Sequence, residues 1–237
     1  MANKKSHSIS SLGRSTWAAI ALFMLGLAII AGFYFEKNTR ISAVEFSGHK
    51  YTTGESLQEA LISPVGLLAD SVNYTELYAS LRELPYVEDV ALRMTFRGTL
   101  TIEIIERQPI GLLVGKPETY FDKAGIQLPA QMGEWVDVPI VYGFKSITPG
   151  DTLTGSEFNQ VKDFLSIAIK DPFCWATISE VAWSKNEGVV ALSSENGVKL
   201  LFGRNRFEEK VSHWKTFYQD VVTHKGINDF RTIDLRF

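Results

Sequence analysis

Residues 73–105 read NYTELYASLRELPYVEDVALRMTFRGTLTIEII, and this stretch predicts a helix followed by a β-hairpin. Asn73 stands three residues before Glu76, which is the spacing of a helix N-cap in a capping box. Apolar residues then recur at the i, i+3, i+4, i+7 spacing of one helix face: Tyr74, Leu77, Tyr78, Leu81 and Leu84. Pro85 cannot continue a helix, so we expect this helix to end before it.

Two strands follow this helix and are expected to pair with each other. Every second residue is apolar in both runs: Val90, Leu92, Met94 and Phe96 in the first, and Leu100, Ile102 and Ile104 in the second. The turn 97–99 contains Gly98 and reverses the chain between them. A hairpin with one apolar face needs a cover, and amphipathic helices supply it.

The residues upstream of this stretch supply the rest of the same unit. Residues 41–47 alternate as a strand, and residues 53–62 form a short helix that ends before Pro64. The order of elements is therefore β-α-α-β-β. We expect one α+β domain at residues 41–109.

An uncharged and almost wholly apolar run covers residues 15–35. Its 21 residues span about 32 Å as a helix, which is enough to cross a hydrocarbon core of about 30 Å. Trp17 and Tyr34 lie near its two ends, where aromatic residues meet the membrane surfaces. The run predicts a single transmembrane helix, so the chain is expected to be a bitopic membrane protein.

The charges around this run predict its orientation. Lys4, Lys5 and Arg14 precede it without any acidic residue, so residues 1–14 are expected in the cytoplasm and residues 36–237 outside it. The alternative is a cleaved signal peptide, whose apolar region runs about 7–15 residues and ends at a small-x-small site. The run here is longer and lacks that spacing, which favours an anchor.

Residues 110–237 are richer in strands and predict a second, mainly β domain with two flanking helices. Strand patterns occur around 120–126, at 139–142, 178–183, 188–193 and 198–202, and at the end of the chain, 232–237. Asn196-Gly197 between two alternating runs is a strong hairpin signal. Helices are expected at 156–170 and 206–223, and the second buries Val211, Trp214, Tyr218, Val221 and Val222.

No pattern in the sequence points to catalysis or to a bound cofactor. The four histidines stand apart from one another, and none has a Cys, His or carboxylate neighbour at metal-ligand spacing. There is no Gly-x-Ser-x-Gly elbow and no phosphate-binding glycine loop.

The single cysteine, Cys174, excludes an intramolecular disulfide and lies in an apolar setting typical of a buried residue. The net charge of −3 gives no basic stripe for nucleic acid. We therefore expect neither an enzyme nor a metal, cofactor or nucleic-acid site.

The final strand pattern, 233–237, lies at the end of the chain and is a natural edge strand. An edge strand carries N–H and C=O groups that can accept a strand from a partner. The alternative, a strand that is capped or paired within its own sheet, is equally compatible with the pattern. Recognition of another protein is thus the activity that the sequence favours.

Residues 41–109 resemble a POTRA domain, the polypeptide-transport-associated module. The segments that carry the resemblance are Val44-Glu45-Phe46-Ser47-Gly48, Leu84-Pro85-Tyr86-Val87, Leu100-Thr101-Ile102-Glu103-Ile104 and Glu106-Arg107-Gln108-Pro109. A short basic tail, one span and a POTRA domain directly behind it are similar to the bacterial FtsQ/DivIB cell-division family. The second unit agrees at residues 120–125, 200–203 and 233–237. Members of the family usually continue past this last stretch, whereas the sequence here stops at Phe237.

The resemblance implies a non-enzymatic scaffold of the divisome, in the inner membrane at the septum. It implies FtsB and FtsL as partners and, through them, an influence on septal peptidoglycan synthesis; FtsK, FtsW and FtsI are further candidate partners. In the family, FtsB adds a strand to the C-terminal edge of the second domain. By position this implies a binding site at Ile233, Leu235, Arg236 and Phe237, with Trp214 and Tyr218 as packing neighbours. Phe237 is then expected to be an aromatic anchor, and Arg236 to meet an acidic residue of the partner.

Two other functions remain open from the residues alone. A POTRA-bearing assembly or secretion factor normally has several POTRA units and a barrel of about ten alternating segments, for which the strands here are too few. A membrane-tethered periplasmic enzyme of unknown type is the second alternative.

Overall fold

The computed structural model describes residues 14–130 and 135–237, with the side chains of residues 14, 15 and 33–38 left aside. The chain forms two compact units. One consists of the residues up to Leu81 together with Asp89–Ile105, and the other of Arg82–Glu88 together with Glu106–Phe237.

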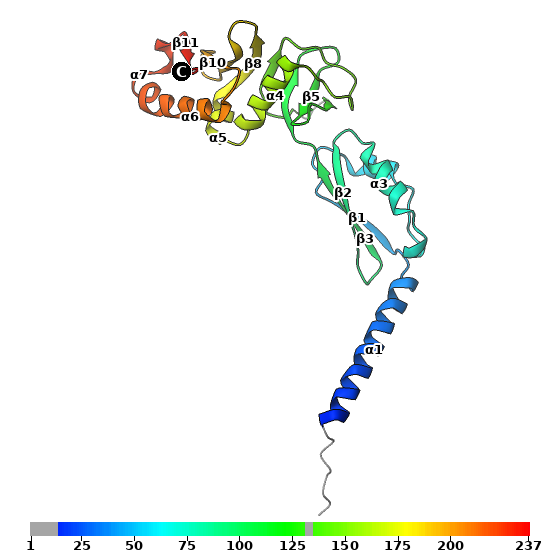
Figure 1. The fold of residues 1–237 in the computed structure, drawn as a ribbon. Coiled ribbons are helices and arrows are strands. Elements are labelled where there is room, and N and C mark those ends of the chain that lie inside the picture. The colour runs from blue at the N-terminus through cyan, green and yellow to red at the C-terminus, as the bar shows by residue number, and fades with distance from the viewer. Residues whose placement is uncertain (1–13, 131–134) are drawn as a thin grey trace, which may run out of the picture. The chain divides into compact units, whose positions relative to one another are not determined.

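The first element is helix α1, Arg14–Asn38 (Figure 1). Most of its described side chains are exposed, among them Trp17, Phe23 and Ile30. Among the described residues, no helix has both the length and the apolarity of a membrane span. The tail predicted at residues 1–14 lies outside the described residues except for its last position.

The POTRA-like part of the chain has the predicted order of elements. Its elements are β1 (Ala43–Ser47), α2 (Gly54–Ala60), the short 3-10 helix η1 (Ala69–Ser71), α3 (Tyr74–Arg82), β2 (Val87–Met94) and β3 (Thr99–Glu106). The strands form a sheet in the order β1-β3-β2, and β1 runs parallel to β3. The predicted cap of α3 is confirmed, because Glu76 donates its N–H to Asn73 Oδ1 at 3.2 Å.

The apolar face of this sheet is buried as the alternation predicts, with one correction. Leu100, Ile102 and Ile104 of β3 are at most 2% exposed. Phe96, which we placed on the apolar face of β2, is 90% exposed. The reason is that β2 ends at Met94, so Phe96 belongs to the turn and no longer follows the pleat.

The second unit is built on one sheet of eight strands. Its strands are β4 (Pro109–Leu113), β5 (Thr119–Asp122), β6 (Gln127–Pro129), β7 (Ile140–Tyr142), β8 (Ile178–Ser184), β9 (Gly188–Ser193), β10 (Lys199–Gly203) and β11 (Thr232–Asp234). Their order across the sheet is β11-β10-β9-β8-β7-β4-β5-β6. The pairs β10–β11, β7–β8 and β4–β7 are parallel, and the others are antiparallel.

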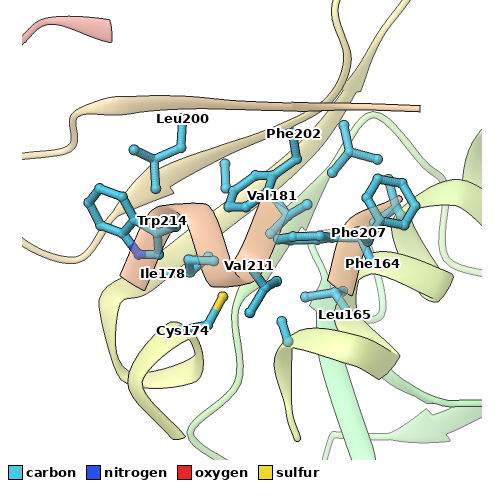
Figure 2. Packing of buried hydrophobic residues seen from close by; sticks show 14 of the residues in the cluster. Phe164, Leu165, Cys174, Ile178, Val181, Leu200, Phe202, Phe207, Val211 and Trp214 are labelled. Carbon is cyan, nitrogen blue, oxygen red and sulfur yellow. The ribbon is translucent and has the colours of Figure 1, made fainter. Parts of the chain in front are cut away.

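Helices cover one face of this sheet (Figure 1). They are α4 (Ser156–Ala168), α5 (Pro172–Thr177) and α6 (Phe207–Phe217), which continues into the π-helical turn η2 (Tyr218–Val222), α7 (Thr223–Lys225) and the 3-10 turn η3 (Ile227–Asp229). Figure 2 shows the core between them, where Phe164, Phe207 and Trp214 from the helices meet Leu200 and Phe202 from β10. Cys174 is buried in this core, which confirms its predicted environment, and burial raises the pKa of its thiol to about 12.

Two elements of the second unit were not predicted. Strand β4 begins at Pro109, which we took as the end of the first unit; a proline is tolerated as the first residue of a strand. Helix α5 is only six residues long, too short to show a periodic pattern. Asp171 caps it by accepting the N–H of Cys174 at 2.9 Å.

The turns of the second unit give a test of this packing. Gly188 and Gly197 both have positive φ, 76° and 59°. A Cβ at Gly188 would overlap the backbone carbonyl of Gly203, whereas a Cβ at Gly197 would meet nothing within 4 Å. We expect Gly197→Ala to lower the free energy of unfolding by about 1 kcal/mol, from the left-handed backbone alone. Gly188→Ala adds a backbone clash and should cost about 3 kcal/mol or more. Urea unfolding followed by tryptophan fluorescence measures both, and equal losses would contradict the close approach of the two strands.

Candidate partner-binding edge

Strand β11 forms one edge of the eight-stranded sheet, as predicted. It is paired on one side only: Thr232, Ile233 and Asp234 align with Lys199, Leu200 and Leu201 of β10. Within the part of the chain that the structure describes, no strand occupies the other side of β11. Both alternatives left open by the sequence therefore hold in part, because one side of the strand is paired within its own sheet and the other is open.

The strand is shorter than predicted. We expected it to run to Phe237, but regular strand ends at Asp234. The pairing nevertheless reaches one residue further, since Leu235 donates its N–H to the carbonyl of Leu201 at 3.0 Å. Only the last two residues leave the sheet.

The backbone of β11 divides its hydrogen-bonding groups between the two sides. Arg231 accepts the N–H of Lys199 at 3.2 Å, and Leu235 donates to β10. Because backbone groups alternate along a strand, Ile233 shares that side, while the N–H and C=O groups of Thr232 and Asp234 point to the open side. These two residues offer the backbone groups that an added strand would use.

Ile233 and Leu235 hold the strand in place with their side chains. Each is 5% exposed and belongs to the core cluster beneath the sheet. Of the predicted site residues, these two thus contribute support for the edge, and their side chains are not available for contact with a partner.

Arg236 is already paired within the chain. Its Nη2 and Nε donate to the two carboxylate oxygens of Asp234 at 2.6 and 2.8 Å, and its backbone N–H donates to the same carboxylate at 3.1 Å. Hydrogen bonds from Arg236 lower the pKa of Asp234 below its ordinary value, so the carboxylate stays ionised and the pair is kept at neutral pH. The expected contact with an acidic residue of a partner would require Arg236 to exchange one carboxylate for another.

Phe237 is the most exposed of the predicted site residues. Its ring is 92% exposed, and the guanidinium carbon of Arg236 lies 5.8 Å from the ring centre. A large aromatic side chain held at the end of an open strand is the kind of group that anchors an interface.

Trp214 lies in α6, and Tyr218 is the first residue of η2, which continues that helix. Trp214 is fully buried and donates its Nε1–H to Thr177 Oγ1 at 2.8 Å. Tyr218 is half-buried, stacks edge-on against Trp214 and donates its hydroxyl to Glu195 at 3.2 Å. Both were predicted to be packing neighbours; the structure makes Trp214 a core residue, labelled in Figure 2, and leaves only Tyr218 at the surface.

Charged residues that we did not predict lie close to Asp234 and Arg236. Lys199, which pairs with Thr232, forms an ion pair with Glu187 at 2.7 Å. Lys210 of α6 is buried and donates its Nζ–H to the carbonyl of Asn205 at 2.6 Å; burial lowers its pKa. Nothing in the sequence marks Glu187 or Lys210, because they reach the edge from different elements. The ion pair between Asp234 and Arg236 could have been predicted from the sequence, because residues i and i+2 of a strand place their side chains on one face.

No cluster of His, Cys, Asp or Glu in the described residues has the arrangement of a metal site. The features at the edge are instead backbone groups, two ion pairs and one exposed ring. An open strand edge of this kind has the backbone groups that can accept an added polypeptide strand.

Comparison with known proteins agrees with this architecture. Residues 39–107 match the family described as POTRA domain, FtsQ-type, and residues 108–237 match that described as FtsQ/DivIB, C-terminal related. The chain is 25% identical over 223 residues to cell division protein FtsQ of Rhodothermus marinus, covering 90% of this chain and 80% of that protein. It is 24% identical over 200 residues to cell division protein FtsQ of Geobacter sp. strain M21, covering 82% and 73%. Since the family match covers more than half of the chain, this protein belongs to the FtsQ/DivIB family.

Proposed function

We propose that this chain is a non-enzymatic scaffold of the bacterial division machinery that captures a strand of a partner protein on the open side of β11. The observation that carries the proposal is the outward direction of the backbone groups of Thr232 and Asp234 on an edge strand. Family membership supports the role in division. The resemblance in the second unit supports FtsB as the strand donor, with FtsL bound alongside it.

We further propose that residues 15–35 anchor the chain in the inner membrane, with residues 1–14 in the cytoplasm and residues 36–237 in the periplasm. Support comes from the uncharged run of 21 residues and from the basic residues that precede it. In this arrangement the POTRA domain (41–109) and the β domain (110–237) both lie outside the membrane. They would hold FtsB, FtsL and other divisome proteins such as FtsK, FtsW and FtsI near the septal peptidoglycan synthase.

Capture of a strand follows from the geometry of the edge. An incoming strand forms backbone hydrogen bonds with Thr232 and Asp234, which give affinity with little dependence on sequence. To extend the pairing to Arg236, the strand must displace the Asp234 carboxylate from the N–H of Arg236. That exchange frees the guanidinium for an acidic residue of the partner, and Phe237 packs against the partner's apolar side chains.

A proline in β11 tests the role of the backbone. Thr232→Pro removes an N–H that points to the open side, and leaves in place the hydrogen bonds that Arg231 and Leu235 make with β10. We expect it to weaken binding of an FtsB ectodomain by about 1–3 kcal/mol, the cost of an unmade hydrogen bond at an interface. Thr232→Val keeps the N–H and is the matched control. Calorimetric titration measures both affinities; equal affinities for the two variants would contradict strand addition at this edge.

The exposed ring at the end of the chain tests the anchor. Phe237→Ala should weaken FtsB binding by about 2 kcal/mol, as loss of an aromatic anchor does, with unchanged stability because the ring contacts solvent in the free protein. Leu235→Ala should instead lower the free energy of unfolding by about 2–4 kcal/mol, since it empties part of the core. Removing all residues after Asp234 combines both effects and abolishes capture. Full affinity of the Phe237→Ala variant would show that the ring lies outside the interface.

The division role itself has a test in cells. Depletion of the protein should produce filaments without septa, and a fluorescent fusion should collect at midcell. Cells that divide normally after depletion, or a fusion spread evenly over the envelope, would favour one of the two alternative functions. Complementation by the Gly197→Ala variant, which changes only an open turn, is the matched control for expression.

A further inference from the structure

The four residues that follow α1 are held between two loops of the first unit. These residues, 39–42, come directly after Asn38, the last residue of the helix. One loop is the segment 64–69, which ends at the first residue of η1, and the other is the turn of the β2–β3 hairpin, 95–98.

The first loop is fastened by both backbone and side-chain hydrogen bonds. Ile41 donates its N–H to the carbonyl of Leu67 at 2.9 Å and accepts the N–H of Gly66 at 2.8 Å. Ala69 donates to the carbonyl of Thr39 at 2.9 Å. Arg40 Nη1 adds a bond to the carbonyl of Gly66 at 2.9 Å. Together these bonds fix the loop against the residues that leave the helix.

The hairpin turn is fastened to the same segment. Ser42 donates its N–H to the carbonyl of Gly98 at 2.8 Å and its hydroxyl to the carbonyl of Arg97 at 3.2 Å. Gly98 has a φ of 85°, and a Cβ there would overlap the carbonyl of Arg40. The turn therefore lies as close to residue 40 as a polypeptide backbone allows.

Both loops expose apolar side chains that the fold does not need. Phe96 is 90% exposed, Val65 51% and Leu67 49%. Arg97 lies beside the Phe96 ring, with 5.7 Å from its guanidinium carbon to the ring centre. We call Arg40, Val65, Leu67, Phe96 and Arg97 the junction patch. The segments 39–42, 64–69 and 95–98 contain two arginines, and the nearest carboxylate is Asp70, which lines one hollow together with Phe96. The patch and Asp70 together keep one net positive charge, so the patch combines apolar groups with positive charge.

Chain length limits how far this patch can be from the end of the proposed membrane span. From Phe35, the last residue of the uncharged run, three helical residues and three extended ones lead to Ile41. They reach at most about 15 Å. The headgroup layer of a bilayer is roughly 6 Å thick on each side of the hydrocarbon core. The connection is short enough that the Phe96 ring enters this layer when residues 36–41 run obliquely to the membrane and not straight away from it. Aromatic and cationic side chains are the groups that favour this layer.

We propose that the junction patch docks on the anionic headgroup layer of the membrane, with Phe96, Val65 and Leu67 in the interface and Arg40 and Arg97 on lipid phosphates. The inference rests on the proposed anchoring by residues 15–35. Docking gives the POTRA domain a second attachment besides its covalent link to α1. It would restrict how the domain turns on its short connection.

The test is the depth of a spin label in the full chain reconstituted in vesicles of phosphatidylethanolamine and phosphatidylglycerol. A Cys174→Ala background leaves no other cysteine, and one label is placed by Phe96→Cys. The matched control is Ile105→Cys, which is 45% exposed at the other end of β3, about 20 Å along the strand from the turn. We expect collisions of the label at 96 with an aqueous nickel complex to be severalfold fewer than at 105, with more frequent collisions with oxygen, which concentrates in the bilayer.

Three outcomes would be informative in different ways. Equal access of the nickel complex to both labels, in a chain that resists carbonate extraction, would overturn docking and leave the anchor intact. A chain extracted by carbonate would contradict the anchor itself and the docking with it. Protection of the label at 96 that appears only after a soluble protein is added would assign the patch to a protein partner and overturn the proposal. Replacing phosphatidylglycerol by phosphatidylcholine, or introducing Arg97→Glu, should raise access at 96 and leave access at 105 unchanged.

Discussion

The second unit depends on the burial of two residues at the edge of its sheet. Ile233 and Leu235 place their side chains in the core. Because side chains and backbone groups alternate along a strand with a period of two, this fixes the direction of every other group of β11. It directs the backbone groups of Thr232 and Asp234 outward, and puts Asp234 and Arg236 together on the opposite face from the core. A slip of one residue would expose the apolar pair and bury the charged one, so this register is the only stable one.

The fold could be read from the sequence where a pattern extended over several turns or residues. Helix α3 had a capping box, five apolar positions at helical spacing and a proline to end it, and the structure places it within one or two residues. Strands β8, β9 and β10 had alternation and an Asn-Gly turn, whose two residues both adopt positive φ as such turns require. Helix α5 and strand β4 had no such signal. The helix is shorter than two helical turns, and the strand begins with a proline, which we interpreted as the end of the preceding unit.

The site was harder to predict than the fold for a physical reason. Its position followed from the chain end and from a resemblance, but the state of each side chain depends on neighbours from other elements. Trp214 has the same helical spacing whether it lies in the core or at its rim. It is buried because residues of α5 and β10 pack around it, and its Nε1–H finds an acceptor in Thr177 of α5. We expected Arg236 to be free for a partner protein, because we considered Asp234 only as one residue of the strand pattern. In the structure, Asp234 binds the Arg236 guanidinium.

Backbone pairing alone would make the open edge unselective, since every polypeptide strand carries the same groups. Selectivity must then come from the charged residues that border it. The Glu187–Lys199 pair joins the turn before β9 to β10, and the Asp234–Arg236 pair lies at the end of β11. Both pairs are formed in the free protein. A strand without an acidic residue for Arg236 would leave the backbone N–H of Arg236 bonded to the Asp234 carboxylate. It would then pair only with Thr232 and Asp234. A strand that does offer one releases that N–H and extends the ladder to the chain end, where Phe237 lies. In the proposed complex, the ion pair would therefore disfavour unrelated strands and favour a partner with the complementary charge, and natural edge strands avoid indiscriminate association in this way.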